Sequence, residues 1–169
     1  QALQVDAATL GAEALGAALT LLCLWTHPGW EGALLSGLGL LLLTTSVVDA
    51  RIFRLLDVFT APIALLALVW AWRRDQMIEG AAAAAIAGAV LYGLKTALER
   101  RRRKPMLGLG DIKLVMALAL CLGERTPLML TAAALAGLAL ALLLRKRDQP
   151  LPFGPFLASS AWVLLMISG

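Results

Sequence analysis

Residues 32–49 read GALLSGLGLLLLTTSVVD, a stretch whose first charged side chain is Asp49 at its end. A helix needs about 20 mainly apolar residues to cross the hydrocarbon core of a bilayer, with a usual range of roughly 17–25. Only helices and closed barrels satisfy their backbone hydrogen bonds in lipid, and barrel strands alternate apolar and polar residues. The continuous Leu-rich run therefore predicts a transmembrane helix that ends at a carboxylate.

The composition of the whole chain supports this prediction. The chain has 169 residues, of which 60% are hydrophobic and 15% are charged, whereas an ordinary soluble domain is roughly 45–50% apolar and about 25% charged. A soluble core of this size cannot hide so many apolar side chains. A water-soluble globule and a disordered chain are both excluded, and two cysteines are too few for a disulfide scaffold.

Charge clusters and Pro or Gly residues divide the remaining apolar sequence into further runs. Candidate spans cover residues 7–26, 32–49, 58–72, 80–98, 111–124, 127–144 and 151–168. All are Leu- and Ala-rich rather than alternating. We therefore expect an all-α, polytopic transmembrane bundle of about seven helices, with residues 1–169 as a single domain.

The basic residues predict how this bundle is oriented, because cytoplasmic loops carry an excess of Lys and Arg. With the N-terminus in the cytoplasm, 12 of the 15 basic residues fall on the cytoplasmic side, and only Arg73, Arg74 and Arg125 fall on the other. The basic run at residues 99–104 adjoins a span, so we interpret it as a contact with lipid headgroups rather than with nucleic acid.

Acidic residues at the edges of the spans are the candidates for function, because ionisable groups at membrane depth are costly. Asp49 ends the second run, one helical turn after Thr45 and Ser46. Asp111 begins the fifth run, whose apolar part from Ile112 to Gly123 has 12 residues, about 18 Å of helix against a hydrocarbon core of about 30 Å. The bilayer must thin there or draw in flanking residues, and both outcomes bring water and a carboxylate to membrane depth.

Each of these two aspartates also has an ordinary structural explanation. Asp111 is a possible N-cap of its helix, and Asp49 is a possible ion-pair partner of Arg51 or Arg54. In the predicted topology, however, both carboxylates lie at the same cytoplasmic boundary. Two aspartates that share one proton can hydrolyse a peptide bond without a metal ion.

Three motifs occur in order from Asp49 onward. They are DARIFRLLDVFTAP at residues 49–62, GLGD at residues 108–111 followed by Ile112-Lys113-Leu114, and PFGPFLA at residues 152–158. Together they resemble the type IV prepilin peptidases, which are GxGD aspartic proteases of bacterial membranes. The resemblance extends from Asp49 to the C-terminus, and the residues before Asp49 fit the family more loosely.

The resemblance implies an aspartic endopeptidase with Asp49 and Asp111 as its catalytic pair, supported by Gly108, Gly110 and Lys113. It also implies that the substrate is a type IV prepilin or pseudopilin, of a pilus or of a type II secretion system. The basic leader would be removed at the cytoplasmic face of the bacterial inner membrane, after a Gly that precedes the apolar helix. No cofactor or metal ion is implied, and the expected partners are the substrate and the lipid bilayer.

The chain departs from the family pattern at two points. Leu56 occupies a position where the family often has Pro, and there is no CxxC pair of the kind that accompanies N-methylation in bifunctional members. Either this is a peptidase-only type or that domain precedes Gln1, and we do not predict methyltransferase activity for these residues. A non-enzymatic membrane subunit or small transporter that uses the same acids remains the alternative.

Five further residues have structural interpretations. Asp57 is expected to cap the third run, and Glu13 to make a polar contact between helices. His27 has no second His for a metal site. Cys23 and Cys121 both lie near the outer ends of their runs, where a disulfide is conceivable, but buried free thiols are expected.

Overall fold

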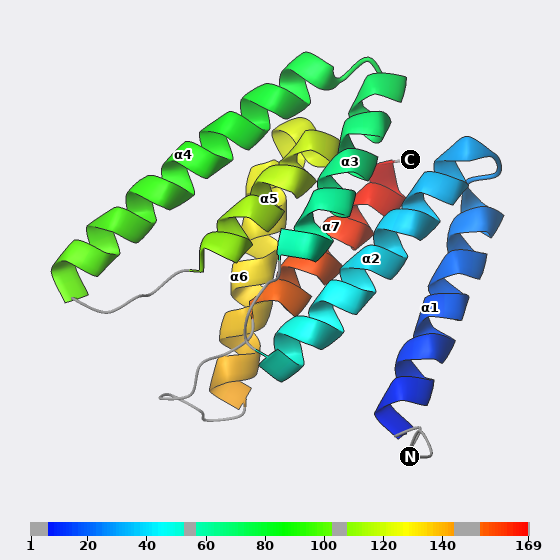
Figure 1. The fold of residues 1–169 in the computed structure, drawn as a ribbon, viewed down its shortest axis with the longest axis horizontal. Coiled ribbons are helices and arrows are strands. Elements are labelled where there is room, and N and C mark those ends of the chain that lie inside the picture. The colour runs from blue at the N-terminus through cyan, green and yellow to red at the C-terminus, as the bar shows by residue number, and fades with distance from the viewer. Residues whose placement is uncertain (1–6, 53–56, 103–107, 144–152, 169) are drawn as a thin grey trace.

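The computed structural model describes residues 7–52, 57–102, 108–143 and 153–168. This part of the chain is helical and contains no strand (Figure 1), which confirms the all-helical prediction. Its elements are α1 (Ala7–Thr26), α2 (Trp30–Ile52), α3 (Asp57–Arg73), α4 (Met77–Arg102), α5 (Leu109–Leu122), the short 3-10 turn η1 (Gly123–Arg125), α6 (Thr126–Leu143) and α7 (Gly154–Ser168).

The apolar runs of the sequence coincide with these helices, but several helices are longer than the runs. The largest difference is at α4, which starts before residue 80 and continues past residue 98 to Arg102. Polar residues can extend a helix because its backbone hydrogen bonds do not depend on apolar side chains. Lys95, near the end of the run, and Glu99, in the added segment, form an i,i+4 ion pair at 3.6 Å.

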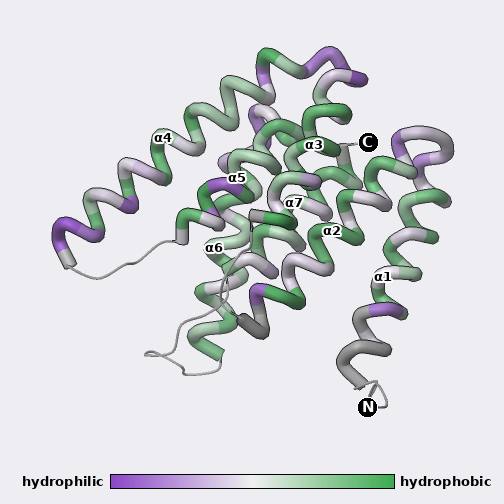
Figure 2. Tube along the Cα trace, in the orientation of Figure 1, coloured by the Kyte–Doolittle hydropathy of each residue, from purple (hydrophilic) through white to green (hydrophobic). Residues whose placement is uncertain are grey.

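Three helical stretches are long and apolar enough to cross a membrane: Trp30–Asp49, Met77–Arg101 and Leu109–Leu143. Shorter apolar helices cover Glu13–Thr26, Val58–Arg73 and Gly154–Ile167. Hydrophobic residues predominate along the lengths of the helices (Figure 2). These features indicate a membrane protein, whereas seven spans and a cytoplasmic N-terminus remain predictions.

The exposed surface of the bundle is itself strongly apolar. Large side chains such as Leu21, Ile78 and Leu143 are mostly exposed. On a water-soluble protein such a surface would be an aggregation hazard or an interface. In a bilayer it is the surface that lipid tails contact, which explains why the helices are apolar on their outer faces as well as on their inner ones.

Helix α5 lies in the middle of the packing. It packs mainly against α3 and α4 and also contacts α7. Leu114 and Leu118 of α5 are completely buried, as is Leu157 of α7. The short helix that carries Asp111 is therefore held on several sides by neighbouring helices.

Small residues allow some of these helices to approach closely, as is common in membrane bundles. A Cβ atom on Gly88 of α4 would lie 2.7 Å from Met116 Sδ of α5, and one on Gly39 of α2 would lie 2.7 Å from Trp162 Nε1 of α7. Gly93 of α4 differs, because nothing lies within 4 Å of a Cβ atom added there.

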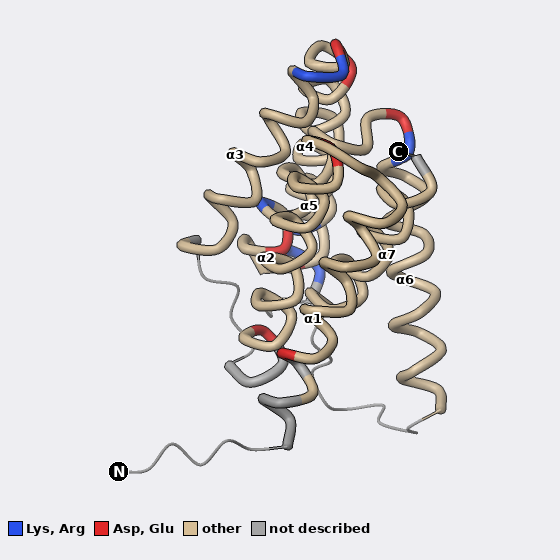
Figure 3. The backbone as a smooth tube through the Cα atoms, turned by 90° about the vertical axis from the view of Figure 1, so that its right-hand side faces the viewer, with Lys and Arg blue, Asp and Glu red and all other residues tan. Residues whose placement is uncertain are grey.

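One end of the bundle holds the α1–α2 and α3–α4 connections. Trp30 and Trp70 meet there with ring centroids 6.1 Å apart, while Trp25 and Trp72 are 88% and 70% exposed. Arg74 lies over the Trp70 ring and forms an ion pair with Glu31 at 3.0 Å. Figure 3 shows charged residues mainly near the two ends of the bundle, with a small group in between.

The predicted sidedness depends strongly on the basic residues 103–104 and 145–147, which lie outside the described residues. The predicted cytoplasmic face therefore stays a prediction. Cys23 and Cys121 are both buried and free, as expected, and Cys23 Sγ lies 3.7 Å from Met166 Sδ.

Candidate active site

Asp49 lies near the end of α2, where its side chain is only 5% exposed. Its Oδ2 accepts a hydrogen bond of 3.1 Å from the backbone N–H of Gly154, the first residue of α7. The expected alternative partners, Arg51 and Arg54, have side chains outside the described residues. A buried carboxylate needs such hydrogen bonds because burial removes its hydration.

The hydroxyls one helical turn before Asp49 donate within their own helix rather than to its carboxylate. Thr45 and Ser46 donate their hydroxyls to the carbonyl oxygens of Leu41 and Leu42 in their own helix, at 2.7 Å each. This back-bonding is common for Ser and Thr inside helices. The hydroxyls are therefore occupied locally, and the recorded hydrogen-bond donor to Asp49 comes from a different helix.

Gly154 is the site residue that sequence reasoning missed. Its motif, Pro152-Phe153-Gly154-Pro155, is expected from the sequence to break the start of the last helix and to shape the bundle near the active site, but not to take part in the reaction. In the structure the carbonyl of Phe153 accepts the N–H of Phe156 and of Leu157, both at 3.2 Å, which starts α7 beside Asp49. A Cβ atom on Gly154 would lie 2.5 Å from Asp49 Oδ2. Glycine is required here because the carboxylate occupies the space of a side chain.

Asp111 lies in the first turn of α5 and is partly exposed. The expectation that Asp111 is the N-cap is wrong, because Gly108 takes this position with an extended backbone at φ −67° and ψ 137°. The Asp111 carboxylate reaches back and accepts a hydrogen bond from the Gly108 N–H. In a capping box, the side chain of the third helical residue accepts a hydrogen bond from the backbone N–H of the N-cap residue. Asp111 is that third residue, and Gly108 is the N-cap.

The two carboxyls are close enough to interact electrostatically. They come from different helices, one from the last turns of α2 and the other from the first turn of α5. Each carboxyl also lies at a helix N-terminus, Asp49 at α7 and Asp111 at α5. Backbone N–H groups at helix N-termini have no partner within the helix, so they are natural donors to carboxylate oxygens.

The other motif residues lie around this pair. Gly108 is close to Asp111, since a Cβ atom there would lie 3.0 Å from its Oδ2. Gly110 is partly exposed in the first turn of α5. Lys113 follows Asp111 by two residues, which turns it to another face of the helix. It is exposed and lines a groove among α3, α4 and α5.

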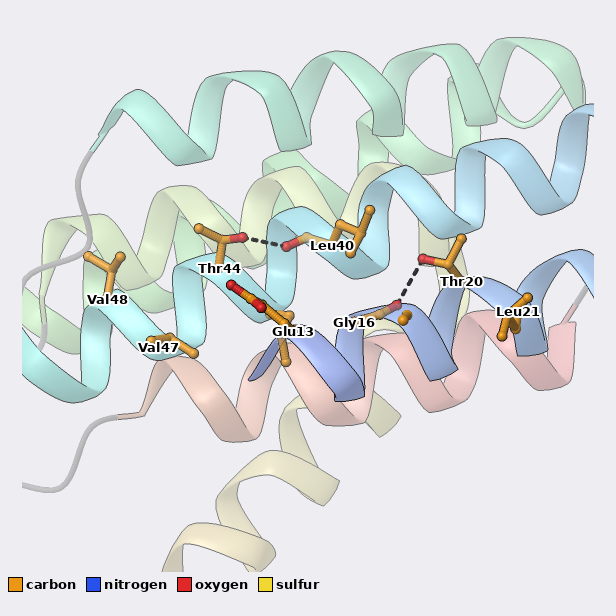
Figure 4. Close-up of a pocket in the computed structure, with 10 residues that line it drawn as sticks. Glu13, Gly16, Thr20, Leu21, Leu40, Thr44, Val47 and Val48 are labelled. Carbon is orange, nitrogen blue, oxygen red and sulfur yellow. Dashed lines mark hydrogen bonds between the residues drawn. The ribbon is translucent and has the colours of Figure 1, made fainter. Parts of the chain in front are cut away.

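Glu13 and His27 lie away from the pair. Glu13 is exposed in a groove of about 760 Å³ between α1 and α2 (Figure 4). Within the described part of the chain it has no recorded hydrogen bond to another helix, so the expected interhelical contact is not observed. His27 Nε2 lies 3.4 Å from the carbonyl oxygen of Met166. The side chain of Asp57 lies outside the described residues.

No group of three or more His, Cys, Asp or Glu side chains that could hold a metal ion occurs in the described part of the chain.

Comparison with known proteins places this chain in a family. Residues 36–142, more than half of the chain, match the type IV leader peptidase family. A prepilin leader peptidase/N-methyltransferase of Burkholderia pseudomallei (strain 1026b) is 36% identical over 146 residues, covering 78% of this chain and 46% of that protein. The enzyme of the same name from Aeromonas hydrophila is 35% identical over 153 residues, covering 82% and 51%.

A third relative has a different name. The type 4 prepilin-like proteins leader peptide-processing enzyme of Escherichia coli O78:H11 (strain H10407 / ETEC) is 31% identical over 138 residues, covering 79% of this chain and 51% of that enzyme. The chain spans about half the length of the curated relatives it matches. No solved structure matches it. The match over residues 36–142 shows that the chain belongs to the type IV leader peptidase family.

Proposed function

We propose that this protein is a membrane aspartic endopeptidase that removes the basic leader peptide from type IV prepilins or pseudopilins. The family and the names of the relatives support this proposal. The observation that carries it is the interaction between the carboxyls of Asp49 and Asp111, which separate helices bring to one end of an apolar bundle. We propose these two residues as the catalytic pair.

In the proposed reaction the pair holds one proton between two carboxyls. The ionised carboxyl takes a proton from a water molecule, whose oxygen attacks the carbon of the scissile peptide. The protonated carboxyl gives its proton to the carbonyl oxygen, which yields a gem-diol. Return of a proton to the peptide nitrogen then breaks the C–N bond and releases a carboxyl and an amine.

The neighbouring groups have supporting roles in this proposal. The N–H groups of Gly154 and Gly108 orient the carboxyls, so that neither has to be reorganised during the reaction. Gly110 gives the substrate backbone room beside Asp111, and Lys113 binds substrate or lipid headgroups.

The proposed orientation places this site at the cytoplasmic face of the bacterial inner membrane. The supporting observation is the unequal distribution of the 15 basic residues along the sequence. We also propose that residues 1–169 form one multi-pass peptidase domain with about seven spans.

Conservative substitutions of the two aspartates test the function. Asp49→Asn and Asp111→Asn keep the side-chain size but remove the ability to share a proton, so both should lose cleavage of a co-expressed prepilin in a gel-shift assay. Asp75→Asn is the matched control, because Asp75 is exposed in the α3–α4 connection and Asn tolerates its φ of 54°. Full cleavage by either site variant would refute the peptidase mechanism.

A further inference from the structure

An open groove of about 760 Å³ runs between α1 and α2 (Figure 4). The residues that line it are spaced three or four apart on each helix, which places them on one helix face. They are Glu13, Gly16, Ala17, Thr20 and Leu21 of α1, and Leu40, Leu43, Thr44, Val47 and Val48 of α2. The lining spans residues 13–21 and 40–48, about 12 Å of each helix at about 1.5 Å per residue. We call this feature the α1–α2 groove.

The hydroxyl groups of the α1–α2 groove are already used as donors. Thr20 donates to the carbonyl oxygen of Gly16 at 2.8 Å, and Thr44 donates to that of Leu40 at 2.7 Å, each within its own helix (Figure 4). The other lining residues, apart from Glu13, are apolar. The lining therefore offers no free side-chain donor, and a ligand that lies along it is apolar over most of its length.

Glu13 is the charged member of the lining. Its side chain is exposed and makes no hydrogen bond or ion pair within the described part of the chain. Figure 4 shows its carboxylate extending from α1 toward the α2 side of the groove. An unpaired carboxylate at the edge of a membrane bundle favours a cation that can donate hydrogen bonds to it.

The position of Glu13 along α1 matches the depth of lipid headgroups. The apolar stretch of α1 begins at Glu13, and the apolar stretch of α2 ends at Asp49, close to the lining residues Val47 and Val48. Both helices therefore change from apolar to polar at this end of the groove. The rest of the groove follows the apolar stretches, where acyl chains surround the bundle.

The α1–α2 groove thus has the polarity of an amphiphile with a cationic head. We propose that it binds a phospholipid whose headgroup carries a primary ammonium, such as phosphatidylethanolamine, with an acyl chain along the groove and the ammonium on the Glu13 carboxylate. A primary ammonium has three hydrogen-bond donors. The quaternary ammonium of phosphatidylcholine has none, and phosphatidylglycerol has no cation. This inference does not depend on the proposed peptidase activity.

An extended peptide fits the same groove less well. Its backbone N–H and C=O groups would lie against apolar side chains and occupied hydroxyls, and unsatisfied backbone groups are costly in lipid. An acyl chain carries no such groups. A helix satisfies its own backbone, so a helix of a second copy of this chain is the competing occupant that the experiments must exclude.

Photocrosslinking tests the headgroup in vesicles of equal parts phosphatidylethanolamine and phosphatidylglycerol. A photoreactive phenylalanine replaces Leu21, which lines the groove, or its neighbour Leu22, which is also exposed on α1 but does not line it. Mass spectrometry counts the adducts of each lipid. The ratio of phosphatidylethanolamine to phosphatidylglycerol adducts should be about five-fold higher at Leu21, the effect of one exposed charge pair. Equal ratios, or an adduct at Leu21 only with a second copy of this chain, would overturn the proposal.

Charge removal tests the role of Glu13. In the protein labelled at Leu21, Glu13→Gln should lower the adduct ratio to the value found at Leu22. Asp75→Asn is the matched control, because Asp75 is an exposed acid in the α3–α4 connection, outside the groove lining. It should leave the ratio unchanged. A ratio that survives Glu13→Gln would overturn the placement of the ammonium on this carboxylate.

A filled groove tests the position of the acyl chain. Ala17→Phe occupies the groove without changing its charge, so it should lower the yield of phosphatidylethanolamine adducts at Leu21 several-fold. Ala18→Phe is the matched control, because Ala18 is exposed on the same helix but does not line the groove. An unchanged yield in Ala17→Phe would overturn the binding of lipid in the α1–α2 groove.

Thermal unfolding in detergent measures the same preference without a crosslinker. A ligand that binds only the folded protein raises its unfolding midpoint. Phosphatidylethanolamine should raise the midpoint more than phosphatidylcholine with the same acyl chains, and Glu13→Gln should remove this difference. Equal midpoints of the native protein with the two lipids would overturn the proposal.

Discussion

Replacement of Gly154 by Ala should inactivate the protein while leaving its fold intact. The added Cβ atom would lie 2.5 Å from Asp49 Oδ2, 3.1 Å from its Cγ and 3.3 Å from its Cβ, whereas ordinary contacts begin at 3.4 Å. The backbone itself accepts alanine, because among the described residues only Gly29 and Gly123 are glycines with positive φ. The cheapest adjustment is therefore a movement of the Asp49 carboxylate.

The size of the effect follows from this displacement. To relieve the contact, the carboxylate must move by about 1 Å, and a misplacement of about 1 Å costs roughly 10²-fold in rate. We therefore expect kcat for prepilin cleavage to fall about 10²-fold, which corresponds to about 2.7 kcal/mol of transition-state stabilisation. The free energy of unfolding should fall by less than about 1–3 kcal/mol, which is the usual cost of overpacking a rigid core.

The assay measures cleavage kinetics and thermal unfolding in the same detergent. Gly93→Ala is the matched control, because Gly93 lies within α4 with nothing inside 4 Å of the added atom. It should keep full activity and gain up to about 1 kcal/mol in stability from its higher helix propensity. Native kcat in Gly154→Ala would refute the view that the Gly154 contact holds Asp49 in its working position.

Two further predictions concern stability. Gly39→Ala would place its Cβ atom 2.7 Å from Trp162 Nε1, and overpacking of this α2–α7 contact should cost about 1–3 kcal/mol, measured by thermal unfolding; an unchanged midpoint would contradict this packing. Glu31→Gln breaks the 3.0 Å ion pair with Arg74. Both side chains are partly exposed, so the free energy of unfolding should fall by at most about 1 kcal/mol. This loss of stability should shrink in 1 M NaCl, where the Debye length is about 3 Å, and a salt-independent loss would argue against an electrostatic origin.

Helix positions were largely predictable because apolar runs and their interruptions are local properties of the chain. The run at residues 7–26 became α1 with the same bounds, and the run at 32–49 became the middle of α2. Differences arise at helix ends, as in α4, where polar residues continue a helix that the apolar pattern already ends. The short fifth run became α5, which is 14 residues long, about 21 Å at about 1.5 Å per residue.

The acids of the site were predictable for a related reason. A carboxylate at the edge of an apolar run is costly, so Asp49 and Asp111 were conspicuous among the 11 acidic residues. Gly154 was not conspicuous, because its significance depends on a contact with a residue 105 positions earlier in the chain.

The sequence by itself determined the helical, lipid-facing character of the protein and the identity of its candidate catalytic acids. The tertiary structure decided which helix faces meet, and with them the hydrogen bond from Gly154 and the interaction of Asp49 with Asp111. The physical reason is that lipid is as apolar as the bundle interior. Hydrophobicity therefore places each helix in the membrane but does not choose its inner face, which depends on the close packing of particular small and polar side chains.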